Sequence, residues 1–136
     1  MIHIYFKIRV IPCLVNPINL FQISDFIYVK DAVEMTIFFD VINEKGSKQN
    51  GIYNIGCGKA GTWLDMAHAL FNALGKEPAI EFIDMPENLV NQYQYFSEAK
   101  IDKIRNAGYK NEIMNLEDAV NNYVKNYLIP GKYLSV

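Results

Sequence analysis

A complete strand–turn–helix unit is the feature that most constrains the fold of this chain. Ile52–Ile55 is a short run of β-formers, and the glycine-rich segment Gly56–Gly61 follows it. Thr62 and Asp65 have the spacing of a capping box, in which side chains satisfy the free N–H groups at a helix start. Gly75 provides a typical helix end. The apolar residues between these signals recur at helical spacing: Met66, Ala67, Leu70, Ala73 and Leu74. The pattern predicts a buried strand followed by an amphipathic helix.

A second strand–helix pair precedes this unit. Phe26–Val29 is rich in β-formers and predicts a strand. Asp31 is a suitable cap for a helix of about a dozen residues. Its apolar positions Val33, Ile37 and Val41 fall on one face, which predicts an amphipathic helix.

Strand and helix signals continue to alternate further along the chain. Ala79–Asp84 alternates in polarity and predicts a third strand. Ser97 is expected to cap a helix that runs to Ala107, because its side chain can accept from free backbone N–H groups. Glu98 suits the positive end of that helix, and Gly108 suits a left-handed stop.

A last helix is predicted after residue 114. Asn115 and Asp118 provide its cap, and Pro130 ends it. Tyr123 and Tyr127 follow helical spacing, so we expect them in the core rather than in contact with a ligand. The alternation of strands and helices along the chain predicts an α/β fold.

The turn Gly56–Gly61 reads G-x-G-x-x-G between a predicted strand and a predicted helix. Glu81 lies about where a ribose-binding acid would be wanted, so a dinucleotide site is one interpretation. In a working fingerprint, however, the helix begins after the second glycine, whereas here Thr62 starts it after Gly61. We therefore favour a tight turn, in which glycine allows positive φ at little cost.

An aromatic cluster, Tyr93, Tyr95 and Phe96, stands just ahead of the helix predicted at Ser97. Aromatic faces beside the N–H groups of a helix start could hold part of a nucleotide. The same side chains could instead belong to the core, and residue chemistry alone favours this second interpretation.

Three segments resemble one family of enzymes. Tyr93–Ala99, followed by Lys103–Tyr109, fits Tyr-Gln-x-Phe-[Ser/Thr]-x-Ala and then Lys-[Ile/Leu]-Arg-x-Ala-Gly-Tyr. Asp25–Asp31 resembles Arg-Asp-Phe-x-Tyr-Val-x-Asp without its arginine, and Gly51–Gly58 resembles Gly-x-[Tyr/Phe]-Asn-[Ile/Leu]-Gly-x-Gly. Together they resemble the C-terminal substrate domain of ADP-L-glycero-D-manno-heptose 6-epimerases, which are extended short-chain dehydrogenases/reductases. The last two segments recur in many sugar-nucleotide epimerases and dehydratases.

The resemblance implies where a substrate would bind. Tyr93 matches a substrate-binding tyrosine of the family, and Gln94 is its neighbour. The family's arginine, expected to grip the substrate pyrophosphate, is replaced by Ser24. Serine has neither the charge nor the planar fork with which arginine makes two charge-assisted hydrogen bonds. We therefore expect an ADP-sugar to bind weakly at Ser24, Tyr93 and Gln94, with Tyr93 as the main contact, Gln94 as a weaker one and Ser24 marking a contact that has been lost.

The family's other half has no counterpart in this sequence. The resemblance implies an NADP-binding Rossmann domain and a catalytic Tyr-x-x-x-Lys pair, yet none of the nine tyrosines is followed by a lysine four residues later. No catalytic or cofactor-binding residue is therefore assigned, and no bound cofactor is expected for this chain alone. Residues 1–23 do not match the family, and residues 24–136 are expected to form its C-terminal substrate-binding domain, as a fragment.

Composition narrows the class of protein further. The 136 residues carry a net charge of −2 without a basic run, which argues against a nucleic-acid partner. Cys13 and Cys57 are too few for a disulfide framework, so a reducing cytoplasm is expected. His3 and His68 lack ligand-spaced companions, so no metal site is expected. Charged residues and prolines interrupt the apolar N-terminus, which argues against a membrane span.

These observations give one main expectation and two alternatives. The chain is expected to be the C-terminal part of an ADP-heptose 6-epimerase, an NADP-dependent isomerase that makes the heptose of the lipopolysaccharide core, and to be inactive alone. Self-association through an exposed apolar patch is also expected, since the other half of the enzyme would normally cover it. The alternatives are the substrate domain of another NAD-dependent sugar-nucleotide epimerase or dehydratase, and a small nucleotide-binding module that uses Gly56–Gly61.

Overall fold

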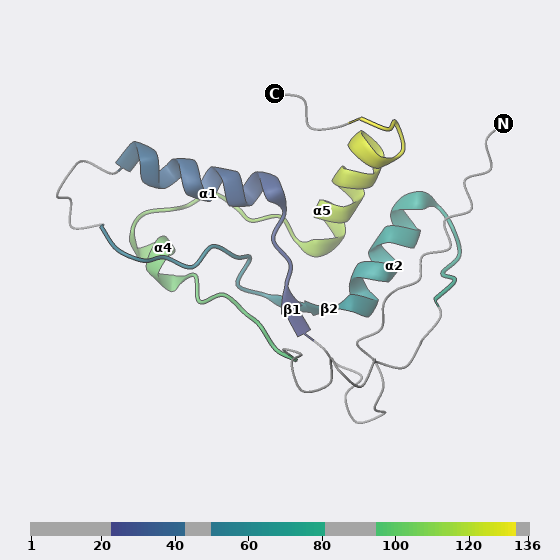
Figure 1. Ribbon diagram of the computed structural model, residues 1–136, viewed down its shortest axis with the longest axis horizontal. Helices are drawn as coiled ribbons and strands as arrows, with labels where there is room; N and C mark the ends of the chain where they lie inside the picture. Colours follow the sequence, from purple (N-terminus) through teal and green to yellow (C-terminus); the bar gives the residue numbers. More distant parts are fainter. Residues whose placement is uncertain (1–22, 43–49, 81–94, 133–136) are drawn as a thin grey trace, which may run out of the picture.

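The computed structural model describes residues 23–42, 50–80 and 95–132 (Figure 1). Helices and a small sheet alternate along the chain, which fits the predicted α/β class. The elements are β1 (Ile23–Asp25), α1 (Val29–Ile42), β2 (Ala60–Thr62), α2 (Trp63–Leu74), α4 (Asp102–Asn106), α5 (Leu116–Tyr123) and the π-helical turn Val124–Leu128 that continues α5. In the described part, no helix is both long enough and apolar enough to cross a bilayer.

The sheet consists of β1 and β2, which pair antiparallel with Ile23 opposite Thr62 and Asp25 opposite Ala60. The strand predicted at Phe26–Val29 is wrong, because the strand lies three residues earlier and Val29 already begins α1. Strand preference depends strongly on the available partner. Here the partner β2 faces residues 23–25, and Phe26 lies beyond the last pair.

The first turn of α1 differs from the prediction. The helix begins at Val29, so Asp31 lies inside its first turn rather than capping it. Its carboxylate is buried and accepts a hydrogen bond of 3.0 Å from the N–H of Met114. Asp31 therefore ties α1 to the segment that leads into α5. The side chain of Val41 lies outside the described set.

The apolar face predicted for α1 points outward. Val33 and Ile37 are 49% and 54% exposed, whereas Met35 is fully buried with Ile104 and Tyr109 in the core. The helix carries apolar residues on two sides, so periodicity alone could not decide which side faces the core. Contact with α4 and the residues that follow it selects the side of Met35.

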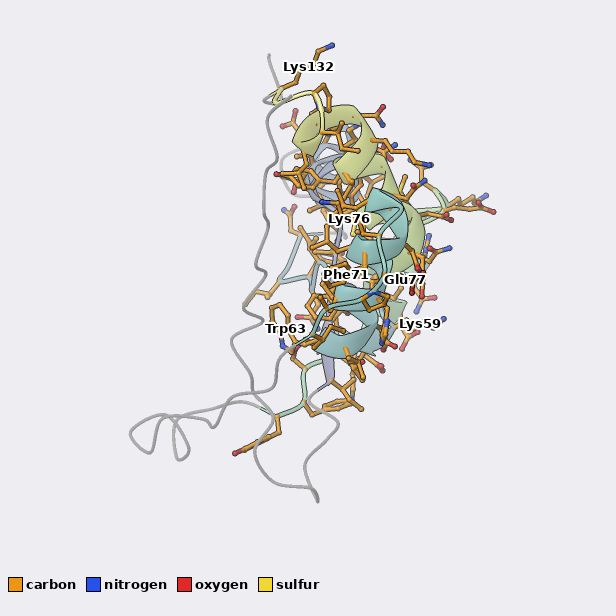
Figure 2. The ribbon with its side chains drawn as sticks, turned by 90° about the vertical axis from the view of Figure 1, so that its right-hand side faces the viewer. Lys59, Trp63, Phe71, Lys76, Glu77 and Lys132 are labelled. Carbon is orange, nitrogen blue, oxygen red and sulfur yellow. The ribbon has the colours of Figure 1, made fainter. Side chains whose placement is uncertain are left out.

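The helix α2 follows the prediction closely. Thr62 and Asp65 form the capping box, since the Asp65 N–H donates to the Thr62 hydroxyl at 3.0 Å and the Thr62 N–H donates to the Asp65 carboxylate at 2.8 Å. These bonds from Thr62 lower the pKa of Asp65. Gly75 ends the helix in the left-handed conformation with φ 64°. Figure 2 looks onto α2, with Trp63 at its first turn and Phe71 further along.

The helix predicted from Ser97 begins five residues further along the chain than predicted. Its first residue is Asp102, and Ser97 does not cap it. The Ser97 N–H instead donates to the carbonyl of Ile23 at 3.0 Å, which holds this residue beside β1. Glu98 accepts from the N–H of Ala60 rather than facing a helix end. Gly108, with φ 106°, adopts the left-handed conformation expected after the helix.

The last helix is capped as predicted. Asn115 accepts from the N–H of Asp118 at 2.8 Å, and the helical turns end before Pro130. Tyr123 is 47% exposed, so the expectation that it belongs to the core is wrong. An apolar groove of about 410 Å³ is lined by residues of α2 and α5 and of the link between β1 and α1.

Two predicted strands have no counterpart in the described residues. Ile52–Ile55 is not a strand, and Ile52 is 89% exposed. Of the strand predicted at Ala79–Asp84, only Ala79 and Ile80 are described, and neither is in a strand. The rest of that prediction lies outside the described residues, as do residues 1–22.

Candidate functional site

The strand β1 joins two segments that are far apart in the sequence. One edge pairs with β2, and the other contacts Tyr95–Ser97. The Ile23 N–H donates to the Tyr95 carbonyl at 3.0 Å, and the Ser97 N–H donates back to the Ile23 carbonyl at 3.0 Å. These bonds place Ser24, one of the predicted substrate contacts, beside the aromatic segment. Tyr93 and Gln94, the other two, lie outside the described residues.

The aromatic side chains of this segment are not core residues. Tyr95 is 37% exposed and Phe96 is 60% exposed. The interpretation that residue chemistry favoured, burial of the cluster, is therefore wrong for these two. They present aromatic surface at the edge of β1 that a planar ligand could use.

Asp25, at the end of β1, organises the junction. Its carboxylate accepts three backbone hydrogen bonds, from the N–H groups of Cys57 at 2.7 Å, Gly58 at 2.9 Å and Ala99 at 2.9 Å. Burial opposes ionisation of this carboxyl, but the hydrogen bonds from Cys57, Ala99 and Gly58 outweigh it and lower the pKa of Asp25. The ionised side chain thus fastens both the glycine turn and the aromatic segment to β1.

The glycine turn is shaped by this contact. A Cβ atom on Gly56 would collide with Asp25 and Ala99, so only glycine allows the turn to approach the carboxylate. Gly58 has φ 70°, and a Cβ there would lie 2.7 Å from the side chain of Ile101. At both positions the geometry of the turn explains why the residue is glycine. This supports the tight-turn interpretation.

The same geometry argues against a phosphate in this turn. A dinucleotide fingerprint offers free backbone N–H groups to the pyrophosphate. Here the N–H groups of Cys57 and Gly58 donate to Asp25. Gly61 lies in β2, so a strand separates the turn from α2. The described residues therefore do not fit a nicotinamide dinucleotide at Gly56–Gly61.

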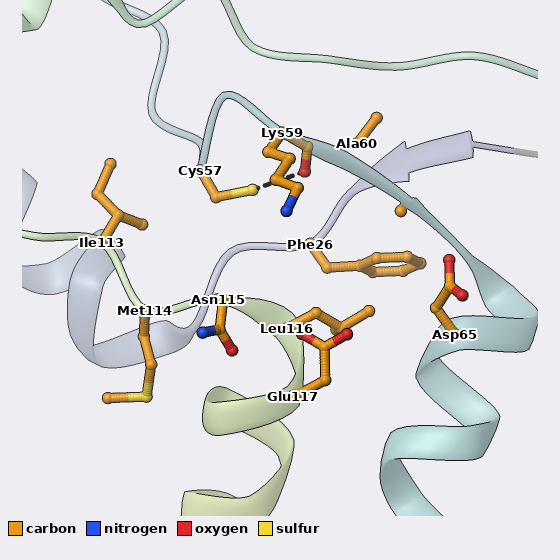
Figure 3. Close-up of a pocket in the computed structure, with 11 residues that line it drawn as sticks. Phe26, Cys57, Lys59, Ala60, Asp65, Ile113, Met114, Asn115, Leu116 and Glu117 are labelled. Atoms are coloured by element: carbon orange, nitrogen blue, oxygen red, sulfur yellow. Dashed lines mark hydrogen bonds between the residues drawn. The ribbon is translucent and has the colours of Figure 1, made fainter.

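The thiol of Cys57 is not activated. Burial and the neighbouring Asp25 carboxylate raise its pKa to about 11, and its Sγ donates to the carbonyl of Lys59 at 2.9 Å (Figure 3). A thiol with such a pKa stays protonated at neutral pH, and the protonated form is a poor nucleophile. Cys57 therefore has a structural role in this turn rather than a covalent one.

A cavity of about 330 Å³ lies on the other side of the turn, toward the start of α5. Figure 3 shows Lys59, Asp65 and Glu117 around it, with Phe26 between the turn and the helices. One lysine and two carboxylates give this cavity mixed charge. Ser24, Tyr95 and Phe96 do not line it, so it is separate from the aromatic edge of β1.

The central role of Asp25 was missed from the sequence. The residue stood in a recognised motif, but its partners lie 32 to 74 positions away, at Cys57 and Ala99. The local signals were an acid just ahead of the strand predicted at Phe26–Val29 and a glycine turn later in the chain. Neither signal says that the two meet.

Comparison with known proteins finds similarity to one class of enzymes, the epimerases, and within that class to one enzyme. No protein-family profile matches the chain. The chain is 49% identical over 107 residues to the ADP-L-glycero-D-manno-heptose-6-epimerase of Nitratidesulfovibrio vulgaris strain DP4, and 48% identical over 107 residues to that of strain Hildenborough. The enzyme of the same name from Fusobacterium nucleatum is 45% identical over 113 residues.

These alignments confirm the resemblance that the sequence motifs indicated. Each covers 79% of this chain but only 32% to 33% of the relative, so the chain spans about a third of the length of the curated relatives it matches. The similarity therefore extends well beyond the three quoted motifs, although it concerns one part of the longer enzymes.

Proposed function

We propose that residues 24–136 are the C-terminal substrate-binding domain of an ADP-L-glycero-D-manno-heptose 6-epimerase, an extended short-chain dehydrogenase/reductase. The observation that carries this proposal is the 49% identity over 107 residues to a protein of that name. The intact enzyme would be a cytoplasmic isomerase that supplies the heptose of the lipopolysaccharide core. This chain would contribute contacts to the ADP-sugar.

The proposed binding surface is the edge of β1. Ser24 lies on that strand, and backbone hydrogen bonds join the strand to the residues that directly follow Gln94. The exposure of Tyr95 and Phe96 supports a surface that can stack on a flat group. Tyr93 and Gln94 are proposed to contact the substrate from the same segment.

The chain alone is proposed to lack turnover. Its sequence has no Tyr-x-x-x-Lys pair, and its glycine turn does not fit a dinucleotide because Asp25 occupies the N–H groups. The redox step of the family would require NADP, which the other part of the enzyme would hold. Residues of this chain would orient the sugar for that step.

Titration of the purified chain with ADP-heptose tests the proposal. We expect specific but weak binding that Tyr93→Ala abolishes and that His68→Ala, a change on the exposed side of α2, leaves unchanged. No epimerisation is expected when NADP is added. Equal binding of UDP- and GDP-sugars would favour another sugar-nucleotide enzyme. Absence of binding, or measurable turnover, would contradict the proposal.

A further inference from the structure

Trp63, the single tryptophan of the chain, is partly open to solvent. It is the first residue of α2, and its side chain is 38% exposed. Figure 2 shows the indole projecting from the first turn of α2, on the side opposite Lys59. Trp63 does not line the cavity that Lys59, Asp65 and Glu117 surround. Neither the capping of α2 nor that cavity therefore accounts for an open indole ring at this position.

The pairing of β1 with β2 places Trp63 beside Ser24. Ser24 lies opposite Gly61, and side chains directly opposite each other in an antiparallel pair point to the same face. Thr62 has an extended backbone, with φ −89° and ψ 157°, so the alternation of side chains continues to Trp63. Trp63 therefore points to the face of Ser24. Diagonal neighbours of this kind lie about 7–8 Å apart.

A ring contact supports this placement independently. Phe26, two residues after Ser24, meets Trp63 edge-to-face, with the ring centroids 4.9 Å apart and the ring planes at 81°. The Phe26 ring also lies next to Gly61, where a Cβ atom would be 3.8 Å from it. The contact holds the indole in place near the pair of Ser24 and Gly61. A side chain that is ordered in advance loses less entropy when a ligand binds.

Tyr95 borders Ser24 from the other side. Ile23 forms a parallel bridge with Phe96, so these two side chains share a face. Because side chains alternate along a strand, Tyr95 points to the opposite face, which carries Ser24. Tyr95 is 37% exposed. Two partly open aromatic side chains, Trp63 and Tyr95, thus flank the face of Ser24, one on each neighbouring segment.

We propose that Trp63 stacks on the adenine base of the ADP-sugar, with the phosphates of the substrate toward Ser24. This inference rests on the proposed function, which places the ADP-sugar at β1. Adenine is the one flat aromatic group of such a substrate, whereas its sugars and phosphates are polar. An indole ring suits adenine, since base–aromatic stacking stabilises nucleotide binding without a hydrogen-bond partner. The ribose bridges the diagonal distance between Trp63 and Ser24.

Packing alone does not explain the exposure of Trp63. Tryptophan is large and on average highly buried, so a tryptophan kept only for its contact with Phe26 is expected to lie deeper. An indole that is held by one neighbouring ring and is still partly open has the rigidity and the accessible surface that stacking requires. Burial under another part of the enzyme is the competing explanation, and a tryptophan with that role would not respond to ADP.

The fluorescence of Trp63 tests the inference directly, because the chain contains no other tryptophan. Titration of the purified chain with ADP or ADP-heptose should give a saturable change in tryptophan emission. Inorganic pyrophosphate, which has no base, should leave the emission unchanged. N-acetyl-tryptophanamide, titrated in parallel, corrects for absorption and collisional quenching. Constant emission under conditions in which calorimetry detects bound ADP would overturn the inference.

Substitutions at Trp63 provide the second measurement. Trp63→Leu should weaken ADP binding about tenfold in calorimetry, whereas Trp63→Phe, which keeps an aromatic face, should lose about threefold or less. Tyr123→Leu is the matched control, because it removes a 47% exposed aromatic ring from α5 and should leave the affinity unchanged. Circular dichroism checks that each variant is folded. If Trp63→Leu does not fold, the emission of the wild type and the affinity of Trp63→Phe decide.

The possible results separate this inference from the proposed function. Binding of ADP-heptose that depends on Tyr93 but not on Trp63 would contradict the inference alone. A saturable response of Trp63 to ADP, without any binding of ADP-heptose, would contradict the proposed function alone. Absence of binding by both ligands would contradict both.

Discussion

Asp25 shows how a single side chain can position a binding surface that it does not itself form. Its carboxylate holds the glycine turn through Cys57 and Gly58, and the aromatic segment through Ala99. These three bonds join parts of the chain that share no local sequence signal. The arrangement of Ser24 and the aromatic residues therefore depends on a charge next to the proposed site.

Asp25→Asn should destabilise the fold by about 1–3 kcal/mol at pH 7, because an amide has one acceptor oxygen and turns an N–H group toward other N–H groups. The pKa of Asp25 is lowered in the folded state, so this carboxylate contributes stability above the unfolded pKa of about 3.9 and loses it as the pH falls through the folded pKa. Urea unfolding at pH 7 and pH 3 measures both effects.

The variant should differ from the wild type less at pH 3 than at pH 7. Part of the acid sensitivity should remain in the variant, because Asp65 also has a lowered pKa. An equal difference between the two proteins at both pH values would contradict an ionised Asp25 as the organising group.

Gly58→Ala should cost about 1–2 kcal/mol, since an L-residue at φ 70° is strained and the new Cβ would press on Ile101. Gly61→Ala is the matched control in the same glycine pattern. A Cβ at Gly61 would make ordinary contacts of 3.4 Å or more, so little change is expected. Thermal unfolding of both variants decides between them, and equal losses of stability would refute this explanation of the turn.

At the scale of elements, the local cap signals of α2 and α5 were reliable, whereas those at Asp31 and Ser97 and the choices between partners were not. The start and end of α2 follow from Thr62, Asp65 and Gly75, which act within one helical turn. The position of β1 and the start of α4 depend on hydrogen bonds to distant segments, and the sequence offers no local indication of them. Propensity and spacing therefore predicted the caps of α2 and α5 but not the pairing of segments that are distant in the sequence.

The orientation of α1 is the clearest element-scale difference. Val33 and Met35 belong to opposite apolar sides of one helix, and only contact with Ile104 and Tyr109 determines which side is buried.

The proposed site could be predicted only through the family resemblance. Ser24 came from a motif comparison, and the structure places it beside the aromatic segment, a juxtaposition that no spacing implied.

Thr62→Ala should destabilise the chain by about 1 kcal/mol, within a usual range of 0.5–2, because it removes one half of the capping box of α2. Thr36→Ala is a suitable control, since its hydroxyl donates within α1 to the Ala32 carbonyl and caps nothing. Denaturant unfolding at neutral pH should separate the two variants by their midpoints. A larger loss in Thr36→Ala would contradict the capping assignment.

For the molecule as a whole, the uncovered apolar surface and the length of the relatives point in the same direction. The chain aligns with about a third of each relative, and its α1 and residues 51–55 expose side chains suited to burial. Both observations support the proposal that this chain contributes to sugar-nucleotide binding as one part of a larger enzyme. Under that proposal, epimerisation requires the other part of the enzyme as well.

Epimerisation by the chimeric enzyme tests that central claim most directly. In the chimera, residues 24–136 replace the aligned part of the Nitratidesulfovibrio vulgaris strain DP4 relative, with Ser24 either kept or changed to Arg. We predict weak conversion of ADP-heptose with serine and a ten- to hundredfold lower KM with Ser24→Arg, since a charge-assisted hydrogen bond contributes about 1.5–3 kcal/mol. A folded chimera that binds NADP but converts no ADP-heptose, with either residue, would contradict the account.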